Sequence, residues 1–171
     1  MGLFSNWFKG RKDTSITPAS ASLQYSRPPE RSINYDPGLV DSLKHDHTEL
    51  VAMYGQLGQE VQGGQFHRIP NALLAFKTRL EAHLLIENVR FYVYVEQSLA
   101  GDSENLALIR GFRREMNSIA RGVVEFVRRY QTTRVTAENS LHFMREYEEV
   151  GQLLVMRIDR EEHSLYPLYA P

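Results

Sequence analysis

Apolar side chains recur at alternating steps of three and four residues along most of this chain. This is the period of an amphipathic α-helix, whereas a β-strand would alternate at every second residue. Proline and glycine divide the pattern into four segments, which run from Pro37 to Gly63, from Pro70 to Gly101, from Ser103 to Tyr130, and from near Thr136 to Pro167. Four helices of roughly 25 residues joined by short loops predict an all-α fold, an up-down-up-down four-helix bundle.

The first part of the chain lacks this pattern. Residues 1–35 contain Pro18, Pro28 and Pro29, many serines and threonines, and few clustered apolar side chains. Such a composition cannot bury enough apolar surface to offset the entropy lost on ordering. The sequence therefore predicts a flexible, disordered N-terminal tail over residues 1–35 and one bundle domain over residues 36–171.

The beginning of this tail has a distinct composition. Four large apolar residues precede three basic ones: Leu3, Phe4, Trp7 and Phe8, then Lys9, Arg11 and Lys12. A short amphipathic segment of this kind can contact a membrane surface or a groove on a partner. The alternative is a solvated N-terminus that carries a few aromatic residues. The segment has neither the apolar length nor the small-residue cleavage site of a signal peptide, so we expect a cytoplasmic protein.

Composition limits the chemistry of the 171 residues. The chain has 20 Lys and Arg residues against 21 Asp and Glu residues, which gives no strong signal for nucleic-acid binding. It contains no cysteine, so disulfides, thiolate metal sites and cysteine nucleophiles are excluded. No apolar run approaches the length needed to span a bilayer. A metal ion in this protein would need histidine and carboxylate ligands.

Five polar residues lie on the otherwise apolar faces of the predicted helices: His47, His83, Glu87, Arg157 and Glu161. A polar side chain on a core-facing position is costly unless it is paired. His83 and Glu87 are four residues apart and share one helix face, an arrangement by which helix bundles build metal sites. A buried histidine–glutamate hydrogen bond without a metal explains the same spacing.

The other histidines lie away from these faces. His142 and Glu146 form a second pair four residues apart, one position off the apolar face of the last helix. They are candidate ligands at the bundle edge, or a solvated contact of the ordinary i,i+4 kind. His45, His67 and His163 have polar or loop surroundings.

The two halves of the chain repeat one another. Aligning the second helix with the fourth, and the first with the third, pairs His83 with Arg157, Glu87 with Glu161, and His47 with Met116. This repeat predicts two copies of a helix pair related by a pseudo-twofold axis. The second copy has lost both histidines.

Together these motifs resemble the hemerythrin-like HHE cation-binding domains. The resemblance rests on Asp46-His47, on His83 with Glu87, and on the closing run from Arg157 through Glu161-Glu162 to Tyr166-Pro167. It covers the chain from about Pro37 to Pro167. It implies a four-helix bundle around a non-haem, usually di-iron, centre that carries or senses oxygen, senses redox state or stores iron. The ligand roles it implies here are those of His47, His83, Glu87 and Glu161.

Two positions depart from that family pattern. Met116 is a poor ligand for iron and packs well as a core residue. Arg157 stays protonated and cannot coordinate a cation, but its guanidinium can hold two carboxylates. Our hypothesis is that Arg157 occupies the place of one metal ion and bridges Glu87 and Glu161. A single iron on His47, His83 and Glu87, or on an otherwise partial di-iron site, stays open, as does a metal-free core.

Two functions follow from this polar core. The first is a non-enzymatic regulatory or interaction module with an unknown protein partner and a reduced metal site. The alternative is an oxygen or redox sensor, or an oxygen- or iron-handling protein, that uses a mononuclear or incomplete di-iron site. No nucleophile–base arrangement or phosphate-binding loop favours an enzyme.

Two further features concern partners. Leu50 to Tyr54, with His83…Glu87 and Arg157…Glu161, is similar to the regulator-of-sigma-D anti-sigma proteins, which implies partner binding. Arginines concentrate on the third helix: Arg110, Arg113, Arg114, Arg121, Arg128 and Arg129. They form either a basic face for an acidic partner or nucleic acid, or a solvated helix face whose charge is diluted by Glu115 and Glu125.

Overall fold

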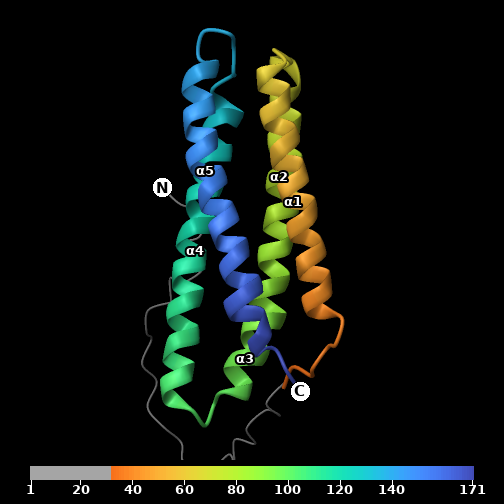
Figure 1. Cartoon of the computed structure of the whole chain (residues 1–171), viewed down its shortest axis with the longest axis vertical. Coiled ribbons are helices and arrows are strands. Elements are labelled where there is room, and N and C mark those ends of the chain that lie inside the picture. The colour runs from red at the N-terminus through yellow and green to blue at the C-terminus, as the bar shows by residue number, and fades with distance from the viewer. Residues whose placement is uncertain (1–31) are drawn as a thin grey trace, which may run out of the picture. The chain divides into compact units, whose positions relative to one another are not determined.

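A computed structural model describes residues 32–171 of the chain. Within this range the fold is entirely helical, and its long helices lie side by side in a four-rod bundle (Figure 1). This confirms the predicted all-α bundle. The expectations for Leu3, Phe4, Trp7, Phe8 and most of the N-terminal tail lie outside the described residues, and the domain boundary stays a prediction.

The four rods are built from five α-helices and several shorter turns. They are α1 (Leu39–Gln62), α2 (Ile69–Ile86), α3 (Tyr92–Ser98), α4 (Ser103–Thr132) and α5 (Ser140–Arg160). A π-helical turn, η2 (Glu87–Phe91), joins α2 to α3. A second π-helical turn, η3 (Glu161–Leu165), extends α5 and is followed by the 3₁₀ turn η4 (Tyr166–Leu168), and the 3₁₀ turn η1 (Phe66–Arg68) precedes α2.

The helix ends follow the residues that predicted them, with one exception. The Asp102 side chain caps α4 by accepting a 3.1 Å hydrogen bond from the backbone of Asn105. Gly64 adopts a φ of 69° after α1, a conformation that suits glycine. The last helix begins at Ser140, so the predicted start near Thr136 is wrong by about one turn. The reason is Asn139, whose side chain bonds the backbone of the preceding loop.

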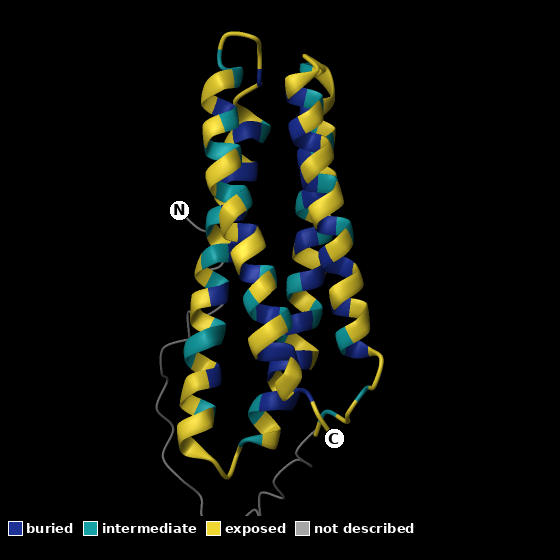
Figure 2. Cartoon of the chain, viewed as in Figure 1, coloured by how far each residue is buried: buried dark blue, intermediate teal, exposed yellow. Residues whose placement is uncertain are grey.

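Two apolar clusters fill the bundle, and buried surfaces of all four rods face one another (Figure 2). One cluster spans the end of the bundle around Phe76 and Phe143, and the other lies around Phe91 and Tyr166. On three of the rods the polar positions fall between residues of the two clusters, and on α4 the buried Met116 lies between Ile109 and Val123 in the same way. The polar side chains therefore form one layer across the bundle. No helix within residues 32–171 is long and apolar enough to cross a membrane.

The helices α1 and α5 approach each other closely above this layer. The rings of Tyr54 and Tyr147 stack with centroids 4.5 Å apart, and each hydroxyl donates to the other residue's backbone carbonyl, at 2.8 and 2.9 Å. Gly58 makes room for the pair, because a Cβ there would lie 2.6 Å from the Tyr147 hydroxyl oxygen. The approach of α1 to α5 thus depends on a missing side chain.

We therefore expect Gly58→Ala to lower the free energy of unfolding by about 1–3 kcal/mol, because the new methyl group must displace a hydrogen-bonded tyrosine. The matched control is Gly55→Ala on the same helix, where a Cβ meets nothing within 4 Å. This control should raise the free energy of unfolding by about 0.5–1 kcal/mol, because alanine is more favourable than glycine in the interior of a helix. Urea unfolding checks both values. Equal effects of the two substitutions would contradict the tight approach.

Candidate metal centre

The polar layer gathers side chains from three rods at one level of the bundle. His47 comes from α1, His83 and Glu87 from the end of α2 and the start of η2, and Arg157 and Glu161 from the end of α5 and the start of η3. All five are buried, with at most 3% of their surface exposed. The residues that the sequence singled out on apolar faces therefore lie together.

Arg157 lies between two carboxylates. Its Nη2 atom is 2.6 Å from Glu87 Oε2, and its Nε atom is 2.6 Å from Glu161 Oε1. Its Nη1 atom donates a 2.8 Å hydrogen bond to the backbone carbonyl of Met116 on α4. The guanidinium thus links α2, α4 and α5, while the fully buried Met116 side chain packs as core.

The two histidines lie on the other side of Glu161. The Nε2 atom of His47 is 3.2 Å from Glu161 Oε2, and the two imidazole centroids are 4.7 Å apart. Neither ring nitrogen of His83 has a hydrogen-bond partner among residues 32–171. A buried polar group without a partner is unusual in a folded protein. One ligand atom from each of His47, His83 and Glu161 lies within 4.8 Å of the others.

Each histidine also faces a carboxylate on its outer side. The Nδ1 atom of His47 is 2.8 Å from Glu162 Oε1, and the Nδ1 atom of His83 is 3.5 Å from Asp46 Oδ2. Asp46 is itself held by Arg79, whose Nη2 atom lies 2.6 Å from Oδ1. Outer carboxylates of this kind fix the orientation of a metal-binding histidine and direct Nε2 inward.

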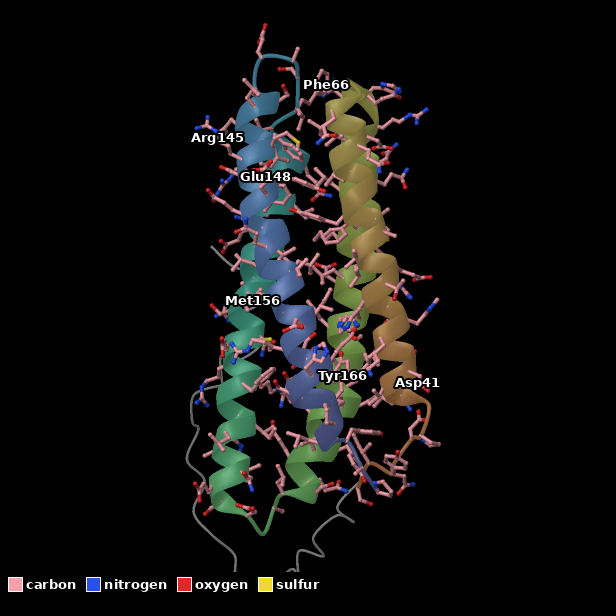
Figure 3. All side chains as sticks on the ribbon, viewed as in Figure 1. Asp41, Phe66, Arg145, Glu148, Met156 and Tyr166 are labelled. Carbon is pink, nitrogen blue, oxygen red and sulfur yellow. The ribbon has the colours of Figure 1, made fainter. Side chains whose placement is uncertain are left out.

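A tyrosine closes the layer from the C-terminal side. Tyr166 follows the π-helical turn that extends α5 (Figure 3), and its ring stacks on His47 with centroids 5.6 Å apart. Its hydroxyl oxygen is 3.3 Å from His47 Nε2 and 3.4 Å from Glu87 Oε1. Glu87 and Glu161 each begin a π-helical turn, so both halves of the repeat change helical register at the carboxylate. Such turns are frequent at functional sites.

The two histidines differ in proton affinity. Burial lowers the pKa of His83 to about 3. The positive charges of His47, Arg157 and Arg79 lower it further, and His47 has the largest effect of the three. Burial also acts to lower the pKa of His47, but the contacts with Glu161 and Glu162 together raise it above its usual value. His83 is therefore a neutral imidazole at pH 7, the form that binds a cation.

The carboxylates leave room for one more positive charge. Burial and the charge of Glu161 raise the pKa of Glu87 to about 8, against the lowering effect of Arg157. Burial acts to lower the pKa of Arg157, but the two carboxylates outweigh it and raise that pKa, so the guanidinium stays charged. One arginine can balance one carboxylate. A proton on Glu87 itself, a proton on His47 or a bound cation can balance the other.

Several contributors to this layer were missed from the sequence. The sequence pattern assigned no site role to Asp46, Arg79 or Glu162, although Asp46 and Glu162 belong to the quoted motifs. Arg79 was detectable, because it lies one helical turn before His83 on the same face.

The edge pair lies outside the polar layer. His142 Nε2 is 3.2 Å from Glu146 Oε1 at the surface, where the histidine side chain is 62% exposed. Arg129 donates to both oxygens of Glu146 at 2.7 Å. The arginine already compensates the carboxylate, so this pair has the geometry of a solvated contact.

Comparison with known proteins gives one finding. The family model described as hemerythrin HHE cation binding domain matches residues 38–169. No curated protein and no solved structure gives a significant match. The matched range includes every residue of the polar layer.

Replacing Arg157 by Met should lower the free energy of unfolding by about 3–5 kcal/mol, because two buried carboxylates lose their shared cation. Denaturant unfolding of the metal-free protein measures this loss.

Glu87→Gln supplies the control for that substitution. In the double variant Arg157→Met, Glu87→Gln, one of the two stranded charges is gone, so the combined loss should be smaller than the sum of the single losses by about 1 kcal/mol or more. Strictly additive losses would show that Arg157 and Glu87 do not stabilise each other.

His83 should make the fold sensitive to acid. Between pH 3 and 6.5 the unfolded chain binds a proton on His83 that the folded chain does not bind, so lowering the pH destabilises the fold. The slope reaches about 1.4 kcal/mol per pH unit. With a chelator present, the stability difference between wild type and His83→Gln should shrink as the pH falls from 7 to about 5. A difference that is constant with pH would contradict a neutral buried His83.

Proposed function

This chain belongs to the hemerythrin HHE cation-binding domain family, and we propose that it is a non-enzymatic regulatory module that binds a single iron ion through His47, His83 and Glu161. The observation that carries the proposal is the buried His83 imidazole, whose two nitrogens lack hydrogen-bond partners within residues 32–171. Burying an amphoteric ring without a partner is costly, and a cation ligated by the ring removes that cost.

The donor atoms fit one metal ion. Two ligands on opposite sides of an ion, each bonded at about 2.1 Å, lie about 4.2 Å apart. The three donor atoms already lie within 4.8 Å of one another, so small side-chain shifts suffice. Two histidines and one carboxylate are the ligand set of non-haem ferrous sites. Glu162 supports His47 from outside at 2.8 Å, as carboxylates do in established metal sites, and Asp46 lies 3.5 Å from His83 Nδ1, within reach of the same role once the ring is ligated.

The surroundings favour one ion over two. Arg157 carries a permanent positive charge between Glu87 and Glu161, the carboxylates that the family resemblance assigns to the centre. A second cation there would meet a guanidinium at close range and would find Met116 in place of a ligand. We therefore propose that Arg157 replaces the second metal. Glu87 then stays paired with Arg157. The sequence had suggested His47, His83 and Glu87 as ligands of a single iron, and in the proposed site Glu161 replaces Glu87 in that set.

The burial of the layer supports a sensing role over catalysis. His83 and Glu161 are at most 1% exposed, so a substrate of any size cannot reach them without opening the bundle. A bound iron would supply electron exchange or binding of a small diatomic ligand. The chain's own residues would hold the ion, keep His83 deprotonated and place the Tyr166 hydroxyl beside Glu87.

A metal-free interaction module is the second candidate. The contacts of Arg157 with Glu87 and Glu161 favour it, because they already neutralise much of the buried negative charge. In that case a proton on His47 provides the remaining compensation, and the bundle acts only through its surface.

Metal analysis separates these candidates. After anaerobic loading with ferrous iron and desalting, elemental analysis should find one iron per chain in the wild type and none in His83→Gln. Glu162→Gln should weaken iron binding about 10–100-fold, because His47 loses its outer support. The control is His142→Gln, an exposed histidine that should leave the iron content unchanged.

Three results would overturn the proposal. Two irons per wild-type chain would show that Arg157 does not replace a metal. Iron in Arg157→His but none in the wild type would show that the site is closed, which favours the metal-free module. Equal loss of iron in His142→Gln and His83→Gln would place the ion elsewhere.

A further inference from the structure

The outer face of α4 carries a row of arginines that the cation site does not use. Arg114, Arg121 and Arg128 are exposed and seven residues apart, so they lie on one line with spacings of about 10.5 Å. None of the three makes an ion pair with another residue of 32–171. Arg110 heads the same line, and its Nε atom lies 3.7 Å from Glu96 of α3. The row therefore faces the side of the bundle on which α3 lies.

An aliphatic strip follows the outer side of the neighbouring rod. Leu85, Val89 and Val93 are four residues apart and are 62%, 48% and 37% exposed. Leu74, on an earlier turn of α2, is 53% exposed. Exposed aliphatic residues are common singly, but a line of them along one rod marks an interaction surface.

The strip and the row belong to one face of the molecule. Arg113 joins the two rods by donating to Glu96 at 2.8 Å and to the Asn88 side chain at 3.1 Å. These contacts neutralise Glu96, and Lys77 lies 3.4 Å from Glu81 on α2. The face thus combines exposed aliphatic side chains with three arginines that make no ion pair within residues 32–171, and we call it the α2–α4 face.

We propose that the α2–α4 face binds the surface of an anionic phospholipid bilayer. Aliphatic side chains can enter the boundary between headgroups and acyl chains, while arginines with long apolar stems reach the phosphates. Each arginine near an anionic leaflet adds about 1 kcal/mol of attraction. The absence of a spanning helix among the described residues agrees with peripheral attachment.

Two observations favour a bilayer over a partner helix. A helix needs a groove, but the Arg113 side chain lies between the strip and the row, with its guanidinium 5.1 Å from the centroid of the Tyr92 ring. A bilayer surface needs no groove. In addition, stable attachment usually takes two membrane signals, and the sequence from Leu3 to Lys12 has the composition of a second one.

The test is co-sedimentation of the full chain with vesicles of phosphatidylcholine alone and of phosphatidylcholine mixed with phosphatidylglycerol. Binding should require phosphatidylglycerol and weaken with salt. The triple variant R114Q/R121Q/R128Q should bind about a hundredfold more weakly, since three arginines contribute about 1 kcal/mol each. The matched control R68Q/R134Q/R145Q removes the same charge from exposed positions away from this face, Arg145 on α5 among them (Figure 3), and should bind like the wild type.

A second variant tests the aliphatic strip. L85S/V89S/V93S should weaken vesicle binding at least tenfold, because serine buries less apolar surface in the bilayer than the aliphatic side chain it replaces. The control L108S/L141S/V155S alters exposed aliphatic residues elsewhere and should not weaken binding. Circular dichroism confirms that each variant is folded.

The proposal fails under three outcomes. Equal losses in the two arginine triple variants would show an effect of net charge alone. Binding that depends on Phe4, Trp7 and Phe8 but not on Arg114, Arg121 and Arg128 would assign attachment to the N-terminal segment only. An absence of vesicle binding, with binding of a synthetic acidic helical peptide through the same arginines, would assign the face to a protein partner.

Discussion

The buried ion pairs of Arg157 determine what the rest of this bundle can do. One guanidinium contacts a carboxylate on each of two rods and a backbone carbonyl on a third. A charge buried at 3% exposure is tolerated only because each of these partners is present. The same cation limits the charge that the layer can still accept to about one unit. The proton affinity and the stability of the layer, and the single iron that we propose for it, therefore all depend on one arginine.

The layer is asymmetric because the two copies of the sequence repeat differ where His83 in the first copy is matched by Arg157 in the second. Both halves keep the carboxylate, Glu87 or Glu161, at the start of a π-helical turn. The first half keeps a histidine one turn before that carboxylate, whereas the second half has Arg157. The first half therefore offers a lone pair to a cation, and the second supplies a cation of its own.

The sequence predicted the parts of the structure that depend on helical period. Apolar faces and glycine or proline boundaries located the four rods, and polar residues on those faces located His47, His83, Glu87, Arg157 and Glu161. The π-helical turns could not be predicted, because one extra residue per turn leaves no compositional signal. The second of these turns, η3, directly precedes Tyr166, whose ring stacks on His47. A regular helix pattern does not predict this contact. The start of α5 was missed because the Asn139 side chain orders the preceding loop.

The π-helical turn η2 contributes both to the buried polar layer and to the α2–α4 face that we propose as a membrane-binding surface. Glu87 lies on its inner side, fully buried against Arg157, and Val89 lies on its outer side in the aliphatic strip. A regular helix and a π-helical turn present different residues to solvent, so the exposure of Val89 depends on the π-helical conformation of this turn. Of the five residues of η2, Glu87 belongs to the buried layer and Val89 to the α2–α4 face, so one turn of backbone contributes to both. A displacement of the η2 backbone would therefore move a residue of the buried layer and a residue of the α2–α4 face together.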